Sequence, residues 1–187
     1  MAFFDTTFHS RFLSDDDRAT YSLVVFLPRE LDRYVMPLRE KYDPIYKAIP
    51  SHICVVFPFQ YAGPVDELAG RLSEELEQLP AFPIELDSIG DFYPKVPVIY
   101  WKVRENQSLS TLYYKLSARL DLTLPHRTYI PHVTVAREIS SHRVMMIKEK
   151  IVPYLPTETF TCRKIDLITP LRGDRWVSVR TFSLPEF

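Results

Sequence analysis

Two segments of the sequence each place a histidine near the start of a run of β-forming residues. Residues 49–59, IPSHICVVFPF, contain His52, and residues 129–136, YIPHVTVA, contain His132. Imidazole has an unperturbed pKa of about 6.5, so it can take up or release a proton near neutral pH. A pair of histidines is therefore a candidate for general acid–base chemistry.

Strand geometry predicts which side chains accompany each histidine. Successive side chains of a strand point to opposite faces, so His132 shares a face with Thr134, while Val133 points into a core. By the same alternation, His52 shares a face with Cys54. Each histidine is thus followed, two residues on, by a small side chain that can form a hydrogen bond.

A structural explanation competes with the catalytic one, because a single histidine within a strand is often a packing residue. Two histidines at equivalent places of a doubled chain favour chemistry. A metal site is disfavoured, since zinc takes three or four protein ligands and no third ligand clusters with the pair. The remaining histidines share no such pattern and are predicted to be surface or loop residues: His9, His126 and His142.

The hydrophobic pattern predicts the elements that must position these residues. Apolar runs indicate strands, and apolar residues at helical spacing indicate helices, with Pro37 expected to kink or split the first helix. The order strand, helix, strand, helix, strand occurs twice before a final strand, which suggests an internal duplication and an α+β fold. The expected strands are 20–27, 52–58, 82–92, 96–103, 129–136, 160–168 and 175–184, and the expected helices are 28–43, 64–79, 106–120 and 140–155.

The length, net charge and cysteine content of the chain limit the class of protein to which it can belong. The chain has 187 residues and a net charge of −1, which fits one domain and no broad basic surface for a long nucleic acid duplex. It contains no apolar run of membrane-spanning length and no secretory signal pattern at its start. Its two cysteines, Cys54 and Cys162, form neither a zinc motif nor a disulfide framework. We expect a soluble, cytoplasmic monomer, with an N-terminal arm at 1–19 and one domain at 20–187.

The two histidine segments resemble a known signature. HVTV at 132–135, preceded by Pro131, is similar to the H-x-[S/T]-x motif of the 2H phosphoesterases, which include 2′-5′ RNA ligase-like proteins and cyclic nucleotide phosphodiesterases. HICVVFPF at 52–59 resembles the first copy of that motif. The resemblance covers most of residues 20–187 and implies a bilobal fold, in which two small sheets flank a central cleft and the lobes are not strictly sequential.

The resemblance also implies roles for particular residues. His52 and His132 would be the catalytic pair on either side of a phosphodiester, and the Thr134 hydroxyl would bond a phosphate oxygen. Cys54 departs from the motif, because it stands where serine or threonine is expected in the phosphate cradle. The implied ligand is a nucleotide or RNA end with a 2′,3′-cyclic or 2′-5′ phosphodiester, and the chemistry requires no metal or organic cofactor.

Three further residues are candidates for contacts with the substrate. Arg127 lies just upstream of the second motif, where a guanidinium could bind a phosphate, although a solvated loop arginine is an equal possibility. Tyr129 is a candidate for stacking on a base. Tyr100 and Trp101 alternate on a strand, so one should be in the core while the other could line the site. Arg172 and Arg175 are predicted to be ordinary surface charges.

Two other functions stay open at this point. The protein could bind nucleotides or RNA ends without turning them over, having lost catalytic proficiency at Cys54. It could also be a cysteine-dependent enzyme in which a histidine activates Cys54. The latter is disfavoured, because a buried free cysteine in a strand is common and usually inert.

Overall fold

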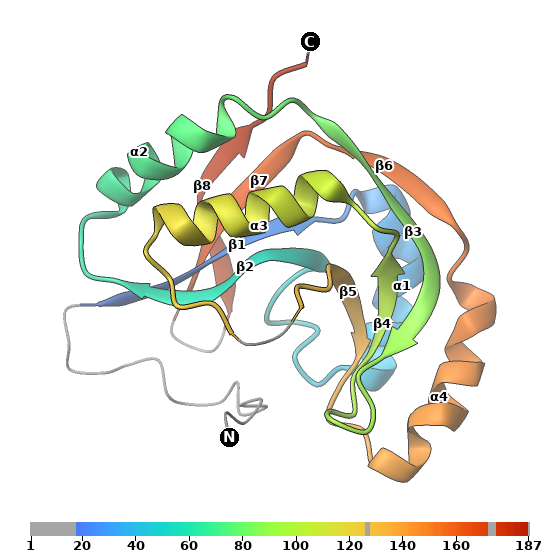
Figure 1. The fold of residues 1–187 in the computed structure, drawn as a ribbon. Helices are drawn as coiled ribbons and strands as arrows, with labels where there is room; N and C mark the ends of the chain where they lie inside the picture. Colours follow the sequence, from blue (N-terminus) through green and yellow to red (C-terminus); the bar gives the residue numbers. More distant parts are fainter. Residues whose placement is uncertain (1–17, 126–127, 172–174, 187) are drawn as a thin grey trace.

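The computed structural model describes residues 18–125, 128–171 and 175–186. Within them it contains eight strands, four α-helices and two short 3₁₀ helices (Figure 1). The predicted order of two strand–helix–strand–helix–strand units is present, and Asn106 caps α3 by accepting a 3.0 Å hydrogen bond from the amide of Leu109. In chain order the elements are β1 (Ala19–Phe26), α1 (Arg29–Tyr42), β2 (His52–Tyr61), α2 (Val65–Leu76), β3 (Phe82–Asp91), β4 (Ile99–Val103), α3 (Gln107–Arg119), β5 (His132–Ala136), η1 (Ser141–Arg143), α4 (Val144–Ile151), η2 (Val152–Tyr154), β6 (Glu158–Cys162), β7 (Lys164–Pro170) and β8 (Trp176–Ser183).

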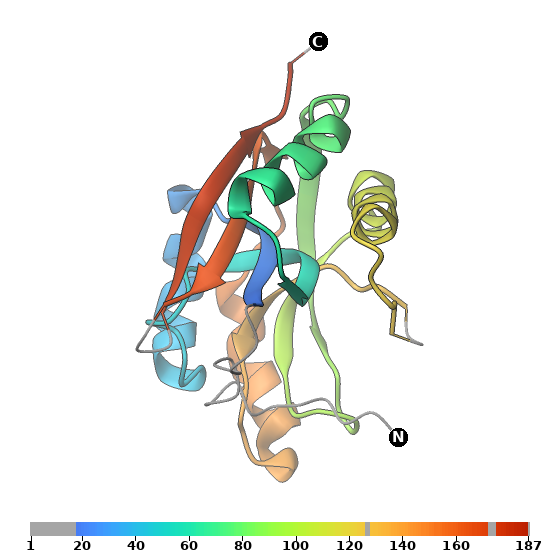
Figure 2. The same ribbon diagram turned by 90° about the vertical axis from the view of Figure 1, so that its left-hand side faces the viewer.

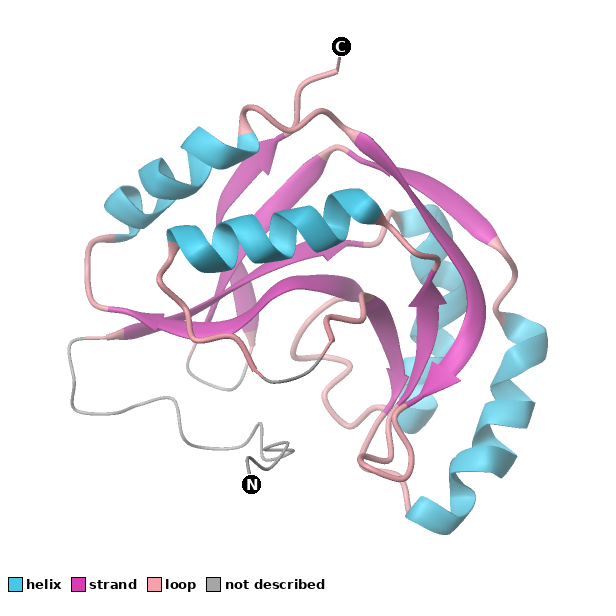
Figure 3. Cartoon of the chain, viewed as in Figure 1, coloured by secondary structure: helices cyan, strands magenta, loops and turns pink. Residues whose placement is uncertain are grey.

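The strands form one sheet with the order β6-β3-β4-β5-β2-β1-β7-β8, and every pairing in it is antiparallel. The expected two small sheets are its two four-stranded halves, which join through β5 and β2. Each half has one copy of the histidine motif on its inner strand. β3 to β6 form one half, whereas β7 and β8 return to the half of β1 and β2, so the halves are not sequential along the chain. The strands curve strongly in space (Figure 3).

The structure differs from the sequence-based elements in two places. The single strand expected at 160–168 is two strands, because the chain bends at Arg163: β6 pairs with β3, whereas β7 pairs with β1 in the other half. The first helix is not split at Pro37, which lies inside the continuous helix α1. The N-terminal arm lies outside the described residues except for Arg18 and Ala19, where β1 begins.

Helices cover the apolar face of the inner strands. Helix α1 packs against β5, and α3 packs against β2, with Tyr113 of α3 edge-on to Phe57. Tyr34 of α1 meets Trp101 of β4 in the same edge-on manner. The two helices lie on the two flanks of the molecule (Figure 2). A large core holds the inner strands rigidly between them, which is what a precisely positioned site requires.

Candidate active site

The two histidine segments pair with each other at the junction of the two halves of the sheet. Ile53 of β2 lies opposite Val133 of β5 in an antiparallel register. Antiparallel partners step in opposite directions along their strands, so the neighbouring residues also pair across the junction. On the other face, this register places His52 opposite Thr134, and Cys54 opposite His132.

This register brings the two imidazoles close together. The same register makes His52 and His132 diagonal neighbours on one face, and such positions are roughly 7–8 Å apart, with their Cβ atoms somewhat closer. That separation allows both rings to contact one small group between them. Each histidine also faces the hydrogen-bonding residue of the other motif, so the site is made from both halves of the chain.

Burial follows the expected alternation. Both histidines, Cys54 and Thr134 are partly exposed. The alternate residues of the two motifs face the core and are fully buried: Ile53, Val55, Val133 and Val135.

Each histidine is fixed by the same hydrogen bond to the backbone. Nδ1 of His52 is 2.8 Å from the carbonyl oxygen of Pro50, and Nδ1 of His132 is 2.7 Å from that of Ile130. A carbonyl oxygen only accepts hydrogen bonds, so Nδ1 carries the proton in both rings. Nε2 is therefore the nitrogen that can exchange a proton with a ligand or water.

The protonation state of His52 follows from its surroundings. Burial lowers the pKa of His52 to about 3, and the positive charges of Arg39, Arg137 and His132 act in the same direction, while the hydrogen bond to Pro50 opposes them. The ring is thus neutral at pH 7, with a lone pair on Nε2. A neutral imidazole with this tautomer can act as a base.

β4 provides one side of the site. Tyr100 pairs with Thr134 across the strands, and its ring lies 4.9 Å from the ring of His132. Its neighbour Trp101 is fully buried on the opposite face. The structure thus places Trp101 in the core and Tyr100 beside His132, although Tyr100 is only 7% exposed.

Two residues near His132 were not predicted from the sequence. Lys102 pairs with His132 across the strands and is exposed, so it brings a positive charge to this face. The ring of Phe92 lies 5.1 Å from that of His132, nearly perpendicular to it. Strand alternation, which places Lys102 on the same face as Tyr100, was a usable signal for the lysine. No pattern pointed to Phe92, because it follows the end of β3.

β1 provides the opposite side with apolar residues. Phe26 pairs with His52, and their rings are 6.5 Å apart in an edge-on arrangement. Val24 pairs with Cys54. Val24 and Phe26 belong to a small apolar cluster with Ile49 that packs beside the site. The site is therefore polar in its centre and apolar toward β1.

The thiol of Cys54 is directed toward a hydroxyl. Its Sγ lies 3.8 Å from Oγ of Ser22, which donates its own proton to the carbonyl oxygen of Val56 at 2.7 Å. A hydroxyl has one proton to donate, so Cys54 is the donor in the contact with Ser22. The thiol forms no disulfide, and it occupies the position that Thr134 has in the second motif.

The structure corrects the expected role of Tyr129. Its side chain is buried, and its ring stacks on Tyr113 with the ring centroids 4.3 Å apart. Its hydroxyl donates a 2.8 Å hydrogen bond to the carbonyl oxygen of Cys54. Tyr129 is thus a buried residue that is already stacked on Tyr113 and bonded to β2, so we assign it to the support of β2 and not to a substrate base. The proline at 131 had hidden this orientation from the strand pattern.

The other arginines and histidines named in the sequence analysis do not form part of the described site. Arg127, His126, His9 and Arg172 lie outside the described residues. Arg175 and His142 are exposed. In the part of the chain that the structure describes, no group of three His, Cys, Asp or Glu side chains could hold a metal ion, and no helix is long and apolar enough to cross a membrane.

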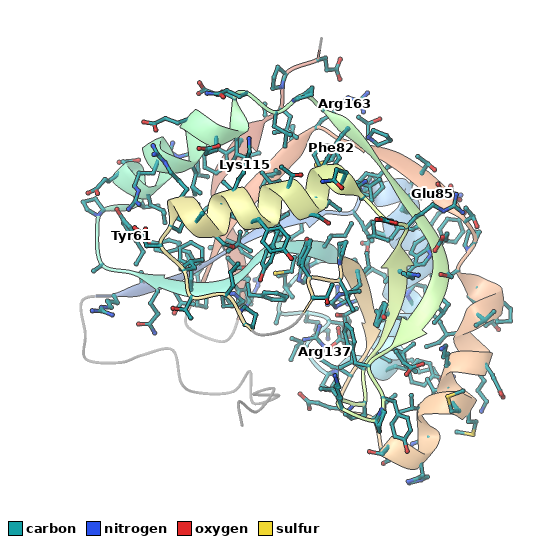
Figure 4. The ribbon with its side chains drawn as sticks, viewed as in Figure 1. Tyr61, Phe82, Glu85, Lys115, Arg137 and Arg163 are labelled. Carbon is teal, nitrogen blue, oxygen red and sulfur yellow. The ribbon has the colours of Figure 1, made fainter. Side chains whose placement is uncertain are left out.

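A buried ion-pair cluster lies beneath His52 and was also missed. Arg137 lies at the end of β5 (Figure 4). Its Nε is 2.9 Å from Oδ1 of Asp43, whose other carboxylate oxygen pairs with Arg39. Arg39 and Asp43 are almost fully buried. The signal for Arg39 was its spacing, because it follows Leu31 and Val35 at intervals of four on the buried face of α1.

Comparisons with known proteins identify the family of this chain. The profile of the 2′-5′ RNA ligase superfamily matches residues 27–174. A protein named "Putative phosphoesterase" from Bacillus licheniformis is 30% identical over 167 residues, which cover 88% of this chain and 98% of that protein. One of the same name from Geobacillus kaustophilus is 26% identical over 166 residues, covering 87% and 94%.

Solved structures share the fold. LigT of E. coli, crystallised with 3′-AMP, aligns with a TM-score of 0.64 at 17% identity, covering 90% of this chain and 99% of LigT. TT0787 of Thermus thermophilus aligns with a TM-score of 0.62 at 17% identity, covering 89% and 98%. The same arrangement of strands and helices thus occurs along nearly the whole length of each of these proteins.

Proposed function

Because the chain belongs to the 2′-5′ RNA ligase superfamily, we propose that it is a phosphodiesterase acting on a 2′,3′-cyclic phosphate or a 2′-5′ linkage of a nucleotide or RNA end. One observation carries this proposal. His52 and His132 lie diagonally across the β2–β5 junction, and each has Nδ1 bonded to a backbone carbonyl, so that Nε2 is the reactive nitrogen. Two imidazoles held in this way can act on opposite sides of one phosphorus atom.

We infer the following proton transfers for this reaction. Nε2 of neutral His52 takes a proton from a water molecule, whose oxygen forms the new bond to phosphorus. The bond from phosphorus to the leaving ribose oxygen breaks, and that oxygen receives a proton from Nε2 of His132. The product is a phosphomonoester and a free hydroxyl. His52 is the base because its pKa is lowered to about 3, which keeps it neutral at pH 7.

Polar groups beside the histidines would stabilise the transferred phosphoryl group. The Thr134 hydroxyl, opposite His52, can donate to a non-bridging oxygen, and the Lys102 ammonium next to His132 adds positive charge on the same face. Cys54 would be the counterpart of Thr134. The LigT crystals with 3′-AMP and with ATP support a nucleotide as the ligand.

A non-catalytic function is the second candidate, and Cys54 is the observation that favours it. A thiol is a weaker hydrogen-bond donor than a hydroxyl, and here its proton is directed to Ser22. A protein with a weakened phosphate cradle could bind nucleotide ends without cleaving them. Binding and turnover must therefore be measured separately.

The experiment compares matched substrates. Purified protein is incubated with 2′,3′-cyclic AMP, with 2′-5′-linked ApA and with 3′-5′-linked ApA as the control, and products are separated by chromatography. We expect product from at least one of the first two, in an amount proportional to enzyme and time, and none from the control. Measurable binding of 2′,3′-cyclic AMP by calorimetry without any product would support the non-catalytic function.

A further inference from the structure

A charged residue occupies a core position on helix α1. Arg39 lies on the same helix face as Leu31 and Val35 and is only 1% exposed. Burying a guanidinium is costly unless it is paired and its donors are satisfied. An apolar residue would be the ordinary choice at this place, so the contacts of Arg39 indicate what it does.

Arg39 uses three different nitrogens on three partners. Nε donates to Oδ2 of Asp43 at 3.0 Å, Nη1 to the hydroxyl oxygen of Ser51 at 3.2 Å, and Nη2 to the carbonyl oxygen of Ile49 at 2.9 Å. Asp43 is the C-cap residue of α1, whereas Ile49 and Ser51 belong to the segment that leads into β2. The guanidinium thus ties the end of the helix to the start of the strand.

The residue between the two tied positions is Pro50, whose carbonyl oxygen holds Nδ1 of His52. Arg39 bonds the backbone carbonyl of Ile49 and the side-chain hydroxyl of Ser51, so it contacts the chain on both sides of Pro50. The direction of the Pro50 carbonyl determines both the tautomer and the ring orientation of His52.

The two motifs share part of their support. The carbonyl of Ile130 fixes His132, and Pro131 accepts a hydrogen bond from the amide of Val103, as Ser51 does from the amide of Leu27. The contacts of Arg39 are an addition to the first motif, because they involve Ile49 and Ser51. A substitution that removes the Arg39 contacts should therefore disturb His52 and leave His132 unchanged.

We propose that Arg39 is a positioning residue for His52: by fixing the chain on both sides of Pro50, it keeps Nε2 of the proposed general base aimed at the substrate. This inference rests on the proposed function for the role of His52 in catalysis. The hydrogen-bond network itself does not depend on that function and can be tested alone.

The charges around His52 are consistent with this role. Arg39 faces it from α1 and Arg137 from the end of β5, with the Asp43 carboxylate between the two guanidiniums, while His132 faces it from β5. After burial, which is the largest cause, Arg39 and Arg137 further lower the pKa of His52. A lysine at position 39 keeps one positive charge, so its effect separates positioning from charge.

The test uses Arg39→Lys, Ser51→Ala and a control, Arg33→Lys, which changes an exposed arginine of the same helix. Lysine retains the charge but lacks the planar fork that reaches three partners at once. Ser51→Ala removes a single hydrogen bond and leaves the buried Arg39–Asp43 pair intact, so it remains informative if Arg39→Lys does not fold. ¹⁵N spectra of the histidine rings report the tautomer of each ring, with or without activity.

We expect both variants to change the ¹⁵N signals of His52 and not those of His132, and Arg33→Lys to change neither. kcat on 2′,3′-cyclic AMP should fall about 10- to 100-fold in Arg39→Lys and roughly fivefold in Ser51→Ala, with KM changing less. Wild-type His52 signals and kcat in both variants would overturn the inference. Altered His52 signals in a protein that has no activity even as the wild type would support the positioning and reject the proposed function.

Discussion

Ile53 and Val133 lie opposite each other across β2 and β5, and this pair is the centre of the candidate active site. The strand order is symmetric about it, with three strands beyond β5 and three beyond β2. Since the two strands run antiparallel, the residue before Ile53 faces the residue after Val133, and the residue after Ile53 faces the residue before Val133. Each histidine therefore lies beside the hydrogen-bonding residue of the other motif, and neither motif forms the candidate site alone.

Removing either histidine should abolish most of the activity. We expect His52→Ala or His132→Ala to lower kcat/KM on 2′,3′-cyclic AMP by roughly 10²–10⁴-fold, as for a lost general acid or base. The double variant should lose little more than either single one, because the two residues act as a unit. Initial rates with purified variants provide the measurement.

His142→Ala is the matched control, since His142 is exposed on η1 and should retain full activity. Circular dichroism should confirm that all the variants are folded. A His52→Ala or His132→Ala protein with wild-type rates would remove that histidine from the mechanism.

The pH dependence should show that His52 is neutral far below pH 7. The acid limb of a kcat/KM profile reports the free enzyme's base. With the pKa of His52 lowered to about 3, that limb should lie well below pH 6.5. An acid limb with a midpoint near 6.5 would show that His52 is not the base, or that its ring is solvated.

Stability gives an independent check of the same pKa. The folded pKa of His52 is below its unfolded value of about 6.5, so the unfolded chain binds more protons between pH 6.5 and 3. This histidine therefore lowers the free energy of unfolding as the pH falls through that window, by at most about 1.4 kcal/mol per pH unit. It has no such effect above pH 7. Urea unfolding of the wild type and His52→Gln should diverge only on the acid side.

Much of this site could be predicted from the sequence because strand alternation is a local rule. The histidine face and the valine face of both motifs are as expected, since two-residue periodicity needs only the strand to exist. Tyr100 and Trp101 were separated by the same rule. The doubling of the chain, together with the family resemblance, indicated that the two motifs meet.

The parts that were missed depend on contacts between distant segments. The bend at Arg163 depends on which strands β6 and β7 pair with, and nothing in 160–168 records that choice. Tyr129 turns inward because Tyr113 and the Cys54 carbonyl meet it there. The helical spacing of Arg39 places it on the buried face of α1, but its partners Ile49 and Ser51 lie in a later segment, so the sequence does not show what it binds.

Tyr129→Phe should lower the stability of the protein without changing which ligand it binds. Burial raises the pKa of Tyr129 well above 10, so the hydroxyl keeps its proton and donates it to the Cys54 carbonyl oxygen. Losing this hydrogen bond should lower the free energy of unfolding by about 0.5–1.5 kcal/mol. Urea titration measures this loss. Tyr114→Phe, at a half-exposed tyrosine of α3, is the control and should change stability little.

The last prediction concerns Cys54, where the first motif departs from the second. A hydroxyl at this position could donate a strong hydrogen bond to a phosphate oxygen, as proposed for Thr134, whereas the thiol donates weakly and toward Ser22. A hydrogen bond to a charged group is worth about 1.5–3 kcal/mol, and each 1.36 kcal/mol is tenfold in rate. We therefore expect Cys54→Thr to raise kcat/KM on 2′,3′-cyclic AMP by roughly tenfold or more.

Two companion variants separate the causes. Cys54→Ser adds the hydroxyl without the methyl group of threonine, so a gain in the serine variant alone would show that the methyl does not fit beside Val24. Cys54→Ala should match the wild type if the thiol contributes nothing. If the serine, threonine and alanine variants are all inactive, and if alkylation of Cys54 abolishes activity unless substrate protects it, the thiol itself takes part in the reaction. The comparison with Thr134 would then be wrong at this position.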